Sequence, residues 1–516
     1  MVVAAPTGAF GCVSLRFWAR QKKEGERHRP GARCGLQLGR AVSNVDAMSG
    51  GRGKLVHFVG ICGTAMGNVA AMMAQSGFRV RGSDRSVYPP MSTFLEEQGI
   101  SLLDGYAADH IDPEPVLCVI GNAVSRGNPE VEEILNRKLY YLSLPETLKE
   151  HFLRKTHNLV VTGTHGKTTT TSLLAWILDR AGMDPGFLIG GLPTNFARGC
   201  RSGGGRYWVL EGDEYDTAFF DKRSKFLHYC PELVIINNIE FDHADIFASL
   251  AEIQTSFRRL TALVPSQGMI LVNADDPNAV AVTRAAPAPI TEVGLSANAA
   301  VRIQGVRSSR EGVRFEILER EFFLPMHGEF NVRNAAMAAT AAHFYQVPLD
   351  VIVSAMASFK GVRRRQEVRA VIGNVTVIDD FGHHPTAIRE TLKSFRLRHP
   401  KARLWALFEP RSNTTRRSVF QDILPPALAL ADGVLVSRVD RLEELPPGER
   451  LNPEKLVADI AATGRPAFYE PDAAGIVTRV TPLLEPGDFV IVFSNGGFGG
   501  IHKRLEEALS ARFIGT

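Results

Sequence analysis

The sequence predicts an α/β protein of three domains that follow one another along the chain. Short apolar strands alternate with helical stretches over most of its length, and two of these strands run into glycine-rich turns that precede a helix. With 516 residues, 45% of them hydrophobic, the chain is long enough for several cores. We expect the domains to cover residues 54–154, 155–359 and 360–516.

Residues 1–53 lie outside this pattern. They hold 9 Lys and Arg against 3 Asp and Glu, which leaves 50 basic and 52 acidic residues in the remainder of a chain whose formal charge is +4. The segment has no apolar periodicity, so we predict that it is disordered, or a spurious extension ahead of a start near Met48. A targeting or basic-tail role is the alternative.

The bulk composition excludes several classes of protein. Without its first 53 residues the chain is nearly neutral, which gives nucleic-acid binding no support. The six cysteines are scattered without a CxxC pair, as expected of free thiols in a reducing compartment such as the cytoplasm. No apolar run reaches the roughly 18–20 residues that cross a bilayer. We therefore expect a cytoplasmic protein with no nucleic-acid or membrane partner; the sequence leaves the oligomeric state open.

The first domain begins with a βαβ unit. A strand at Leu55–Val59 runs into the turn GICGTAMG, a helix is expected over Asn68–Ser76, and a second strand, Phe78–Arg81, ends before Gly82-Ser-Asp84. Such a turn can bind a phosphate, and Asp84 suits a nucleotide ribose, including that of NAD. Because the spacing is not GxGxxG, a purely structural turn is an equal alternative.

The second domain opens with the most specific motif. A strand, Asn158–Thr162, leads into GTHGKTT at Gly163–Thr169 and a helix over Thr170–Ala181. Backbone N–H groups of such a turn bind phosphates, the lysine neutralises their charge, and the next hydroxyl holds Mg²⁺. Val161 stands where the full pattern has its first glycine, yet a nucleotide site is favoured over a plain turn.

Acidic residues follow two later strands of this domain. The run EGDEYD at Glu211–Asp216 comes after one strand, and Asp242-His243 follows the strand Leu233–Ile236. Carboxylate and imidazole beside a phosphate loop suit a divalent metal. The alternative, solvated loop charges, is expected for most of these residues but not for Glu211 and His243. A Pro- and Ala-rich connection is expected near 285–298.

Three further motifs are ambiguous alone. The run HGEFNVRN opens an alanine-rich helix and puts Asn331 and Asn334 on one face, for nucleotide contact or for capping. In the third domain Arg363–Arg365 and the run DDFGHHP at 379–385 lie either side of a strand, where a solvated basic face and structural histidines are the alternatives. Further strands are expected at Val375–Ile378, Leu404–Phe408, Gly433–Val436 and Phe489–Phe493.

Taken in order, GTHGKTT, EGDEYD, DH, HGEFNVRN, RRRQE and DDFGHHPT resemble the Mur ligase family over residues 54 to about 510. The resemblance implies a UDP-N-acetylmuramate-binding, Rossmann-like N-terminal domain, a P-loop-like ATPase domain and a Rossmann-like C-terminal domain. It also implies ATP-driven phosphorylation of the muramoyl carboxylate, attack of an amine on the acyl phosphate, and release of ADP and phosphate.

Five stretches depart from the alanine-adding branch of the family, namely VYPPMST, FFDKRSKF, EFDHADIF, LFEPRSNT and SNGGFGGIH. They resemble the branch that attaches the recycled tripeptide L-alanyl-γ-D-glutamyl-meso-diaminopimelate to UDP-N-acetylmuramate, which we adopt as the prediction. The alternatives are the alanine-adding activity and an inactive nucleotide-binding relative. The complete set of Lys167, Thr168, Glu211 and His243 argues against an inactive protein.

The resemblance implies a role for each matching residue. ATP would contact Gly163, Thr164, His165, Gly166, Lys167, Thr168, Thr169, Asn334, Arg365 and Asp380. Mg²⁺ would be held by Thr168, Glu211 and His243, and the catalytic residues would be Lys167, Glu211, His243, Arg365 and His383. The UDP substrate would contact Gly60, Gly63, Thr64, Gly67, Ser83 and Asp84, and the peptide Arg411, Ser412, Asn413 and Asn495. Some family members carry a carbamylated lysine after the DH pair; here no lysine lies between Lys225 and Lys360, so Arg258 or Arg259 is the nearest basic substitute.

Overall fold

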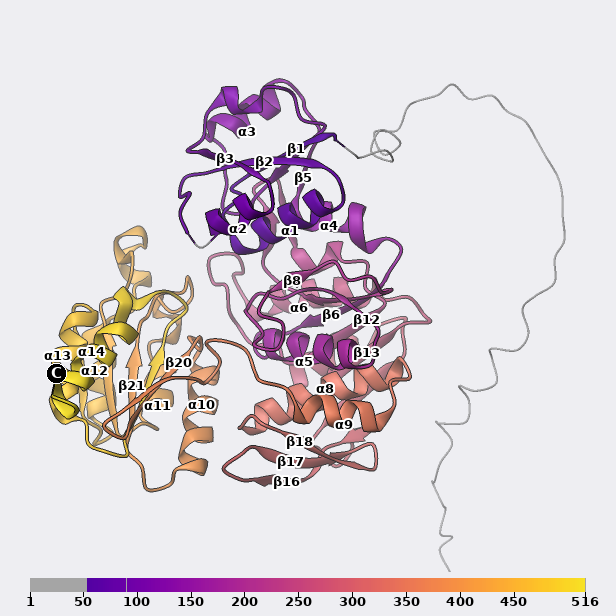
Figure 1. Cartoon of the computed structure of the whole chain (residues 1–516). Helices are drawn as coiled ribbons and strands as arrows, with labels where there is room; N and C mark the ends of the chain where they lie inside the picture. The colour runs from indigo at the N-terminus through magenta and orange to yellow at the C-terminus, as the bar shows by residue number, and fades with distance from the viewer. Residues whose placement is uncertain (1–52, 90, 516) are drawn as a thin grey trace, which may run out of the picture. The chain divides into compact units, whose positions relative to one another are not determined.

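The computed structural model describes residues 53–89 and 91–515, so the prediction for residues 1–53 falls almost entirely outside the described chain. Within these ranges the structure contains three main sheets flanked by helices, in the order of the three predicted domains (Figure 1). No helix of the described part is both long and apolar enough to cross a membrane.

The first sheet is parallel, with strand order β3-β2-β1-β4-β5. Helix α1 begins at Thr64, directly after the GICG turn, so the predicted start at Asn68 was four residues late. The second strand reaches Asp84, so Gly82, Ser83 and Asp84 belong to it instead of following it. The elements are β1 Leu55–Val59, α1 Thr64–Gln75, β2 Arg79–Asp84, α2 Met91–Glu97, β3 Ser101–Asp104, β4 Leu117–Ile120, α3 Pro129–Asn136, β5 Tyr141–Ser143 and α4 Leu144–Leu148.

The middle sheet has eight strands in the order β15-β14-β13-β12-β6-β9-β7-β8, parallel except for β8. The central strands β12 and β13 are buried throughout and mainly apolar, and β6 and β9 are buried except at their end residues, as a sheet covered on both faces requires. The eight strands are β6 His157–Thr162, β7 Gly186–Leu188, β8 Cys200–Arg201, β9 Tyr207–Glu211, β12 Leu233–Ile236, β13 Met269–Asn273, β14 Ile290–Gly294 and β15 Val301–Arg302. The expected connection at 285–298 therefore contains a strand, β14, which its Pro- and Ala-rich surroundings concealed.

Helices α5 and α8 pack on one face of this sheet and share its core. Helix α5 begins at Lys167, three residues before the predicted start, so the lysine lies in its first turn. A small antiparallel sheet, β16–β18, packs beside α8 and α9 (Figure 1). The remaining elements are α5 Lys167–Arg180, β10 Asp216–Ala218, β11 Asp221–Ser224, α6 Leu250–Thr261, α7 Pro277–Thr283, β16 Gln304–Ser308, β17 Val313–Ile317, β18 Arg320–Leu324, α8 Glu329–Phe344 and α9 Leu349–Ala357.

The third sheet has the order β19-β20-β24-β21-β22-β23, and only β19 is antiparallel. Alternate residues of its strands face two separate cores: Leu404 and Ala406 pack with α10–α12, while Trp405 and Leu407 pack with α13 and α14. Its elements are β19 Glu367–Ile372, β20 Val375–Asp380, α10 Pro385–Arg398, β21 Leu404–Phe408, α11 Leu424–Leu428, β22 Gly433–Ser437, α12 Pro453–Ala461, β23 Ala467–Glu470, α13 Ala473–Val480, β24 Phe489–Phe493 and α14 Ile501–Phe513.

Candidate active site

A cleft of about 1150 Å³ lies where strands of the middle and third sheets end. Both sheets present carboxyl ends of parallel strands to it, which is where α/β sheets bind ligands. Most residues predicted for ATP, metal and peptide line this cleft: Thr164, His165, Gly166, Lys167, Thr168, Thr169, Glu211, His243, Asn334, Arg365, Asp380, His383, Arg411, Ser412, Asn413 and Asn495. Neither Gly163 nor any of the six residues predicted for the UDP substrate is among its lining residues.

The phosphate loop connects β6 to α5 and requires its glycines. Gly163 and Gly166 have φ values of +130° and +80°, which L side chains rarely adopt. A Cβ on Gly166 would lie 2.3 Å from Asn334 Oδ1. The His165 N–H donates to Asn238 Oδ1 at 2.7 Å, which fixes the turn at the positive end of α5. The loop therefore presents a preformed anion-binding surface.

A buried ion network lies beside this loop. Glu214 is 2% exposed and contacts Lys167 Nζ at 2.9 Å and His243 Nε2 at 3.2 Å. Burial opposes ionisation, but the Lys167 charge and the His243 hydrogen bond hold the pKa of Glu214 at about 2. Burial would lower the pKa of His243, but the hydrogen bond to Glu214 and the Glu214 charge outweigh this effect and raise that pKa to about 9. Glu214 was expected to be a solvated loop charge, which was wrong because its partners come from distant segments.

Thr168 and Glu211 form a hydrogen-bonded pair beside a second acid, Asp213. The Thr168 hydroxyl donates to Glu211 Oε1 at 2.8 Å, and the Gly190 N–H donates to Oε2 at 2.7 Å. Burial and the neighbouring charge of Asp213 raise the pKa of Glu211. Hydroxyl and carboxylate oxygens are the donor set that Mg²⁺ prefers, so these residues fit the predicted ion.

The two asparagines of HGEFNVRN lie on one face of α8. Asn334 Nδ2 donates to Asn331 Oδ1 at 3.3 Å, and Asn331 Nδ2 donates to the His327 carbonyl at 2.7 Å. Asn331 is thus hydrogen-bonded to the segment that precedes α8, while Asn334 lies against Gly166 of the phosphate loop. The predicted adenine contact of Asn334 stays a prediction.

Arg365 reaches from the third domain to the phosphate loop. One of its terminal nitrogens donates to Thr168 Oγ1 at 3.2 Å. Burial lowers the pKa of Arg365, and the charge of Asp380 opposes that shift. The Asp380 carboxylate accepts from the backbone N–H groups of Gly382 and Gln366 at 2.7 and 3.0 Å. His383 lies in the same wall, with Nε2 3.8 Å from Asp242.

The residues predicted to bind the peptide differ in whether their polar groups already have partners within the protein. The Ser412 hydroxyl contacts Thr415 Oγ1 at 2.8 Å, and Asn413 Nδ2 donates to Asp245 at 2.7 Å. Arg411 only approaches carboxylates of Glu409 and Asp440, each at 3.9 Å. Asn495 Oδ1 is buried without a hydrogen-bond partner among the described residues.

In the first domain, backbone contacts hold the GICG turn. The Gly60 and Ile61 N–H groups donate to the Ser83 carbonyl at 2.8 and 3.0 Å, and the Cys62 N–H donates to Asp84 Oδ2 at 2.9 Å. The Ser83 hydroxyl is buried and donates to Glu130 instead of facing the turn. The roles predicted for these residues toward a UDP substrate stay predictions.

Neither predicted basic substitute reaches the cleft. Arg258 and Arg259 are exposed on α6 and do not line it. Lys225 lies closer to the acidic run, with Nζ 3.8 Å from Asp213 and 4.0 Å from the centre of the Tyr215 ring. Chain spacing after the DH pair therefore pointed to the wrong residues.

Comparison with known proteins decides the family. Three family models match in succession: "Mur ligase family, catalytic domain" at 55–156, "Mur ligase middle domain" at 161–342 and "Mur ligase, glutamate ligase domain" at 363–496. The UDP-N-acetylmuramate–L-alanyl-γ-D-glutamyl-meso-2,6-diaminoheptandioate ligase of Haemophilus influenzae is 41% identical over 89% of this chain and 100% of its own. This chain belongs to the Mur ligase family.

Other Mur ligases are similar to this chain over nearly their whole lengths. The Escherichia coli ligase of the same name is 43% identical over 89% of this chain and 98% of its own length. The UDP-N-acetylmuramate–L-alanine ligase of Salinibacter ruber is 32% identical over 89% of this chain and 96% of its own length. A murein peptide ligase crystal structure from Psychrobacter arcticus has a TM-score of 0.67 and 36% identity over 89% of this chain and 99% of its own. The predicted family and three-domain α/β fold are thereby confirmed.

Proposed function

We propose that this Mur ligase joins L-alanyl-γ-D-glutamyl-meso-diaminopimelate to UDP-N-acetylmuramate, with conversion of ATP to ADP and phosphate, during peptidoglycan recycling. The observation that carries the proposal is the 41–43% identity, over 98–100% of their lengths, to two ligases named for that reaction. The alanine-adding relative from Salinibacter ruber is 32% identical. Because both substrates and ATP are cytoplasmic metabolites in such a pathway, we also propose a cytoplasmic location.

The phosphate end of the cleft supports the first chemical step. The γ-phosphoryl group passes from ATP to the muramoyl carboxylate, which gives an acyl phosphate and ADP. The loop N–H groups, Lys167 and Arg365 would neutralise charge on the transferred group, mainly by position and electrostatics. Thr168 and Glu211, with His243 at a second position, would hold Mg²⁺, which supplies additional positive charge beside the phosphates when bound.

The opposite end supports the second step. The peptide's L-alanine amine attacks the acyl carbon, phosphate leaves, and the nitrogen loses its proton as the amide forms. The far end of the peptide carries the diaminopimelate, which has an ammonium and a carboxylate on its distal carbon. We propose that Arg411 binds the carboxylate, because it is a loosely paired cation between two carboxylates. Glu409, Asp440 and Asn495 Oδ1, which is unpartnered within the described chain, would face the ammonium, since these oxygens accept hydrogen bonds from its N–H groups.

Measurement of ADP release tests the proposal. Purified full-length protein, ATP, Mg²⁺ and UDP-N-acetylmuramate would be supplied with either the tripeptide or L-alanine. We expect rapid ADP release with the tripeptide and little with L-alanine. Faster release with L-alanine would assign the alanine-adding activity, and no release with either would assign a non-catalytic relative.

A further inference from the structure

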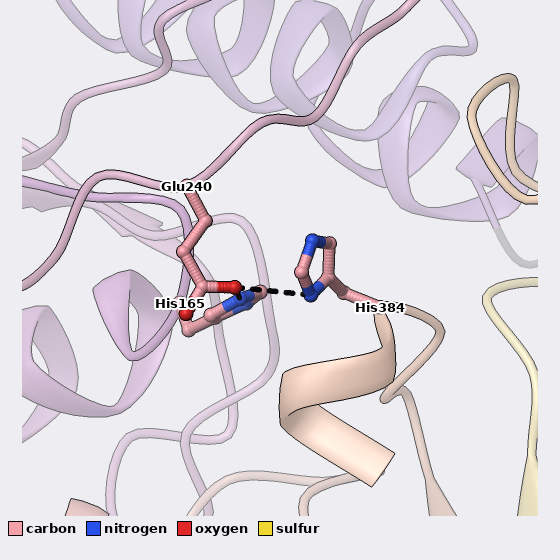
Figure 2. A group of neighbouring side chains, drawn as sticks. All are labelled: His165, Glu240 and His384. Atoms are coloured by element: carbon pink, nitrogen blue, oxygen red, sulfur yellow. Dashed lines mark hydrogen bonds and ion pairs between the residues drawn. The ribbon is translucent and has the colours of Figure 1, made fainter. Parts of the chain in front are cut away.

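Two imidazoles and one carboxylate converge on one wall of the cleft, from His165, Glu240 and His384 (Figure 2). His165 belongs to the phosphate loop, Glu240 to the segment after β12, and His384 caps the N-terminus of α10. Glu240 Oε2 lies 3.4 Å from His165 Nε2 and 3.4 Å from His384 Nδ1. One donor atom from each residue lies within 4.8 Å of the other two.

These separations match a metal coordination shell. Ligand atoms that each lie about 2.0–2.1 Å from a tetrahedral zinc ion are about 3.3 Å apart, which is the edge of the tetrahedron. Two of the three edges, from Glu240 to His165 and to His384, have this length at 3.4 Å, and the third, between the two imidazoles, lies within 4.8 Å. The two edges from Glu240 are longer than the 2.7–3.2 Å of a good hydrogen bond between the same atom types. Two nitrogens and one carboxylate oxygen also form a common protein donor set for zinc.

The protonation of His384 leaves a lone pair facing Glu240. Its Nε2 lies 3.2 Å from the Phe241 carbonyl, which can only accept, so Nε2 carries the proton. The Thr386 N–H donates to Nδ1 at 3.2 Å, so Nδ1 is bare. Burial, followed by the neighbouring His165, lowers the pKa of His384 to about 3, so the ring is neutral. A bare nitrogen and a carboxylate oxygen therefore face each other without a proton between them.

The surrounding contacts are those that orient metal ligands. A ligating imidazole usually donates its other N–H to a carbonyl or carboxylate, as His384 does to Phe241. A ligating carboxylate is usually hydrogen-bonded in turn, and Glu240 Oε2 accepts from the Thr386 hydroxyl at 2.7 Å. Metal binding at Nδ1 would displace only the Thr386 N–H from that nitrogen.

We propose that His165, Glu240 and His384 form a binding site for a borderline divalent transition-metal ion such as Zn²⁺, separate from the Mg²⁺ position at Thr168 and Glu211. Imidazole ligands favour zinc and cobalt over magnesium, which prefers oxygen. All three residues line the cleft, so a fourth coordination position is open to water. Since His384 begins α10 of the third domain and His165 lies on the phosphate loop of the middle domain, the ion would link these domains beside the nucleotide site.

Cobalt binding to the full-length protein tests this site. Co²⁺ would be titrated without nucleotide in excess Mg²⁺, which occupies the oxygen-rich position, and its visible absorption recorded. We expect one ion with the strong absorption of low-coordinate Co²⁺, displaced by Zn²⁺. His384→Asn retains a capping side chain and removes the imidazole, so it should weaken Co²⁺ binding about 100-fold or more.

Matched variants locate the ion. His383→Asn changes the adjacent histidine, whose Nε2 lies near Asp242, and should leave Co²⁺ affinity unchanged. His165→Gln, on the other domain, should weaken binding as His384→Asn does, which keeps the test valid if one variant folds poorly. Equal affinity in the wild type, His165→Gln and His384→Asn would overturn the proposal. Loss of binding in Glu211→Gln but not in His384→Asn, or no binding at millimolar Co²⁺, would also overturn it.

Discussion

The two ends of the cleft hold their charged side chains differently. At the phosphate end the side chains of Lys167 and Glu214 are 12% and 3% exposed, and they contact each other at 2.9 Å. At the peptide end Arg411 is 41% exposed and lies 3.9 Å from each of its carboxylate neighbours. Buried pairs are expensive to break, whereas loosely held exposed charges can exchange protein partners for a ligand.

This difference indicates that the phosphate end is preorganised and also stabilises the domain, while the peptide end is free to adapt. A substitution at the first end should therefore affect both stability and turnover. A substitution at the second end should affect one substrate alone.

Lys167→Ala should give the largest loss, a fall in kcat of about 10³-fold or more, because the loop loses the cation nearest the transferred phosphate. It should also destabilise the protein by about 1.5–3 kcal/mol, because the buried Glu214 charge loses its hydrogen bond from Lys167 and keeps only His243 as a partner. Lys167→Ala/Glu214→Gln should recover stability without recovering turnover. Lys455→Ala, an exposed control, should change neither; near-normal turnover of folded Lys167→Ala would contradict the ATP-site assignment.

Arg411→Ala should raise the KM for the tripeptide and for no other substrate. A lost charge-assisted hydrogen bond to a carboxylate corresponds to a rise in tripeptide KM of roughly 10–100-fold. The KM values for ATP and UDP-N-acetylmuramate should move little. The melting temperature should be unchanged, because the two carboxylates that Arg411 approaches are each 3.9 Å away. Arg465→Ala is the matched exposed control. Equal losses for all three substrates, or none, would show that Arg411 does not read the peptide.

Asp275→Asn should reduce stability in a pH-dependent way. Burial opposes ionisation of Asp275, but hydrogen bonds from Ser296, Leu295 and Arg333 hold its pKa at about 2. Because the folded pKa is depressed, its contribution of about 2 kcal/mol is complete above pH ~4 and is lost as the pH falls toward ~2. Urea unfolding should show the difference from wild type falling to roughly half by pH ~3. A difference that is constant with pH would contradict this account, and Asp422→Asn is the exposed control.

Deletion of residues 1–47 should have the smallest effect. The segment shows no apolar periodicity in the sequence, so we expect neither end of the cleft to depend on it. Melting temperature and ADP release of the truncated and full-length proteins should coincide. A large fall in melting temperature would show that the segment docks on the folded domains.

Local patterns predicted the fold and much of the cleft. Buried parallel strands such as β6 and β21 appear in the sequence as short apolar runs, and the glycine, lysine and threonine of GTHGKTT occur at a strand end. Helix starts were placed three or four residues late at α1 and α5, because glycines in the preceding turns hide the first helical turn. Strand β14 was missed because its flanking prolines and alanines are typical of a connection.

Residues whose role depends on tertiary contacts could not be found this way. Glu214 is one of four acids in EGDEYD, and only its burial against Lys167 and His243 distinguishes it. His384 adjoins His383, yet it is His384 that joins Glu240 and His165. Ser83 was expected after the second strand, but it lies within β2 and its hydroxyl faces Glu130 in the core.

The identity of the product tests the central claim most directly. The protein would be given ATP, Mg²⁺, UDP-N-acetylmuramate and equal concentrations of the tripeptide and L-alanine, and the UDP-linked products separated and weighed by mass spectrometry. We predict UDP-N-acetylmuramoyl-tripeptide as the dominant product, formed in step with ADP. A predominance of UDP-N-acetylmuramoyl-L-alanine, or ADP formation without any amide product, would contradict the account.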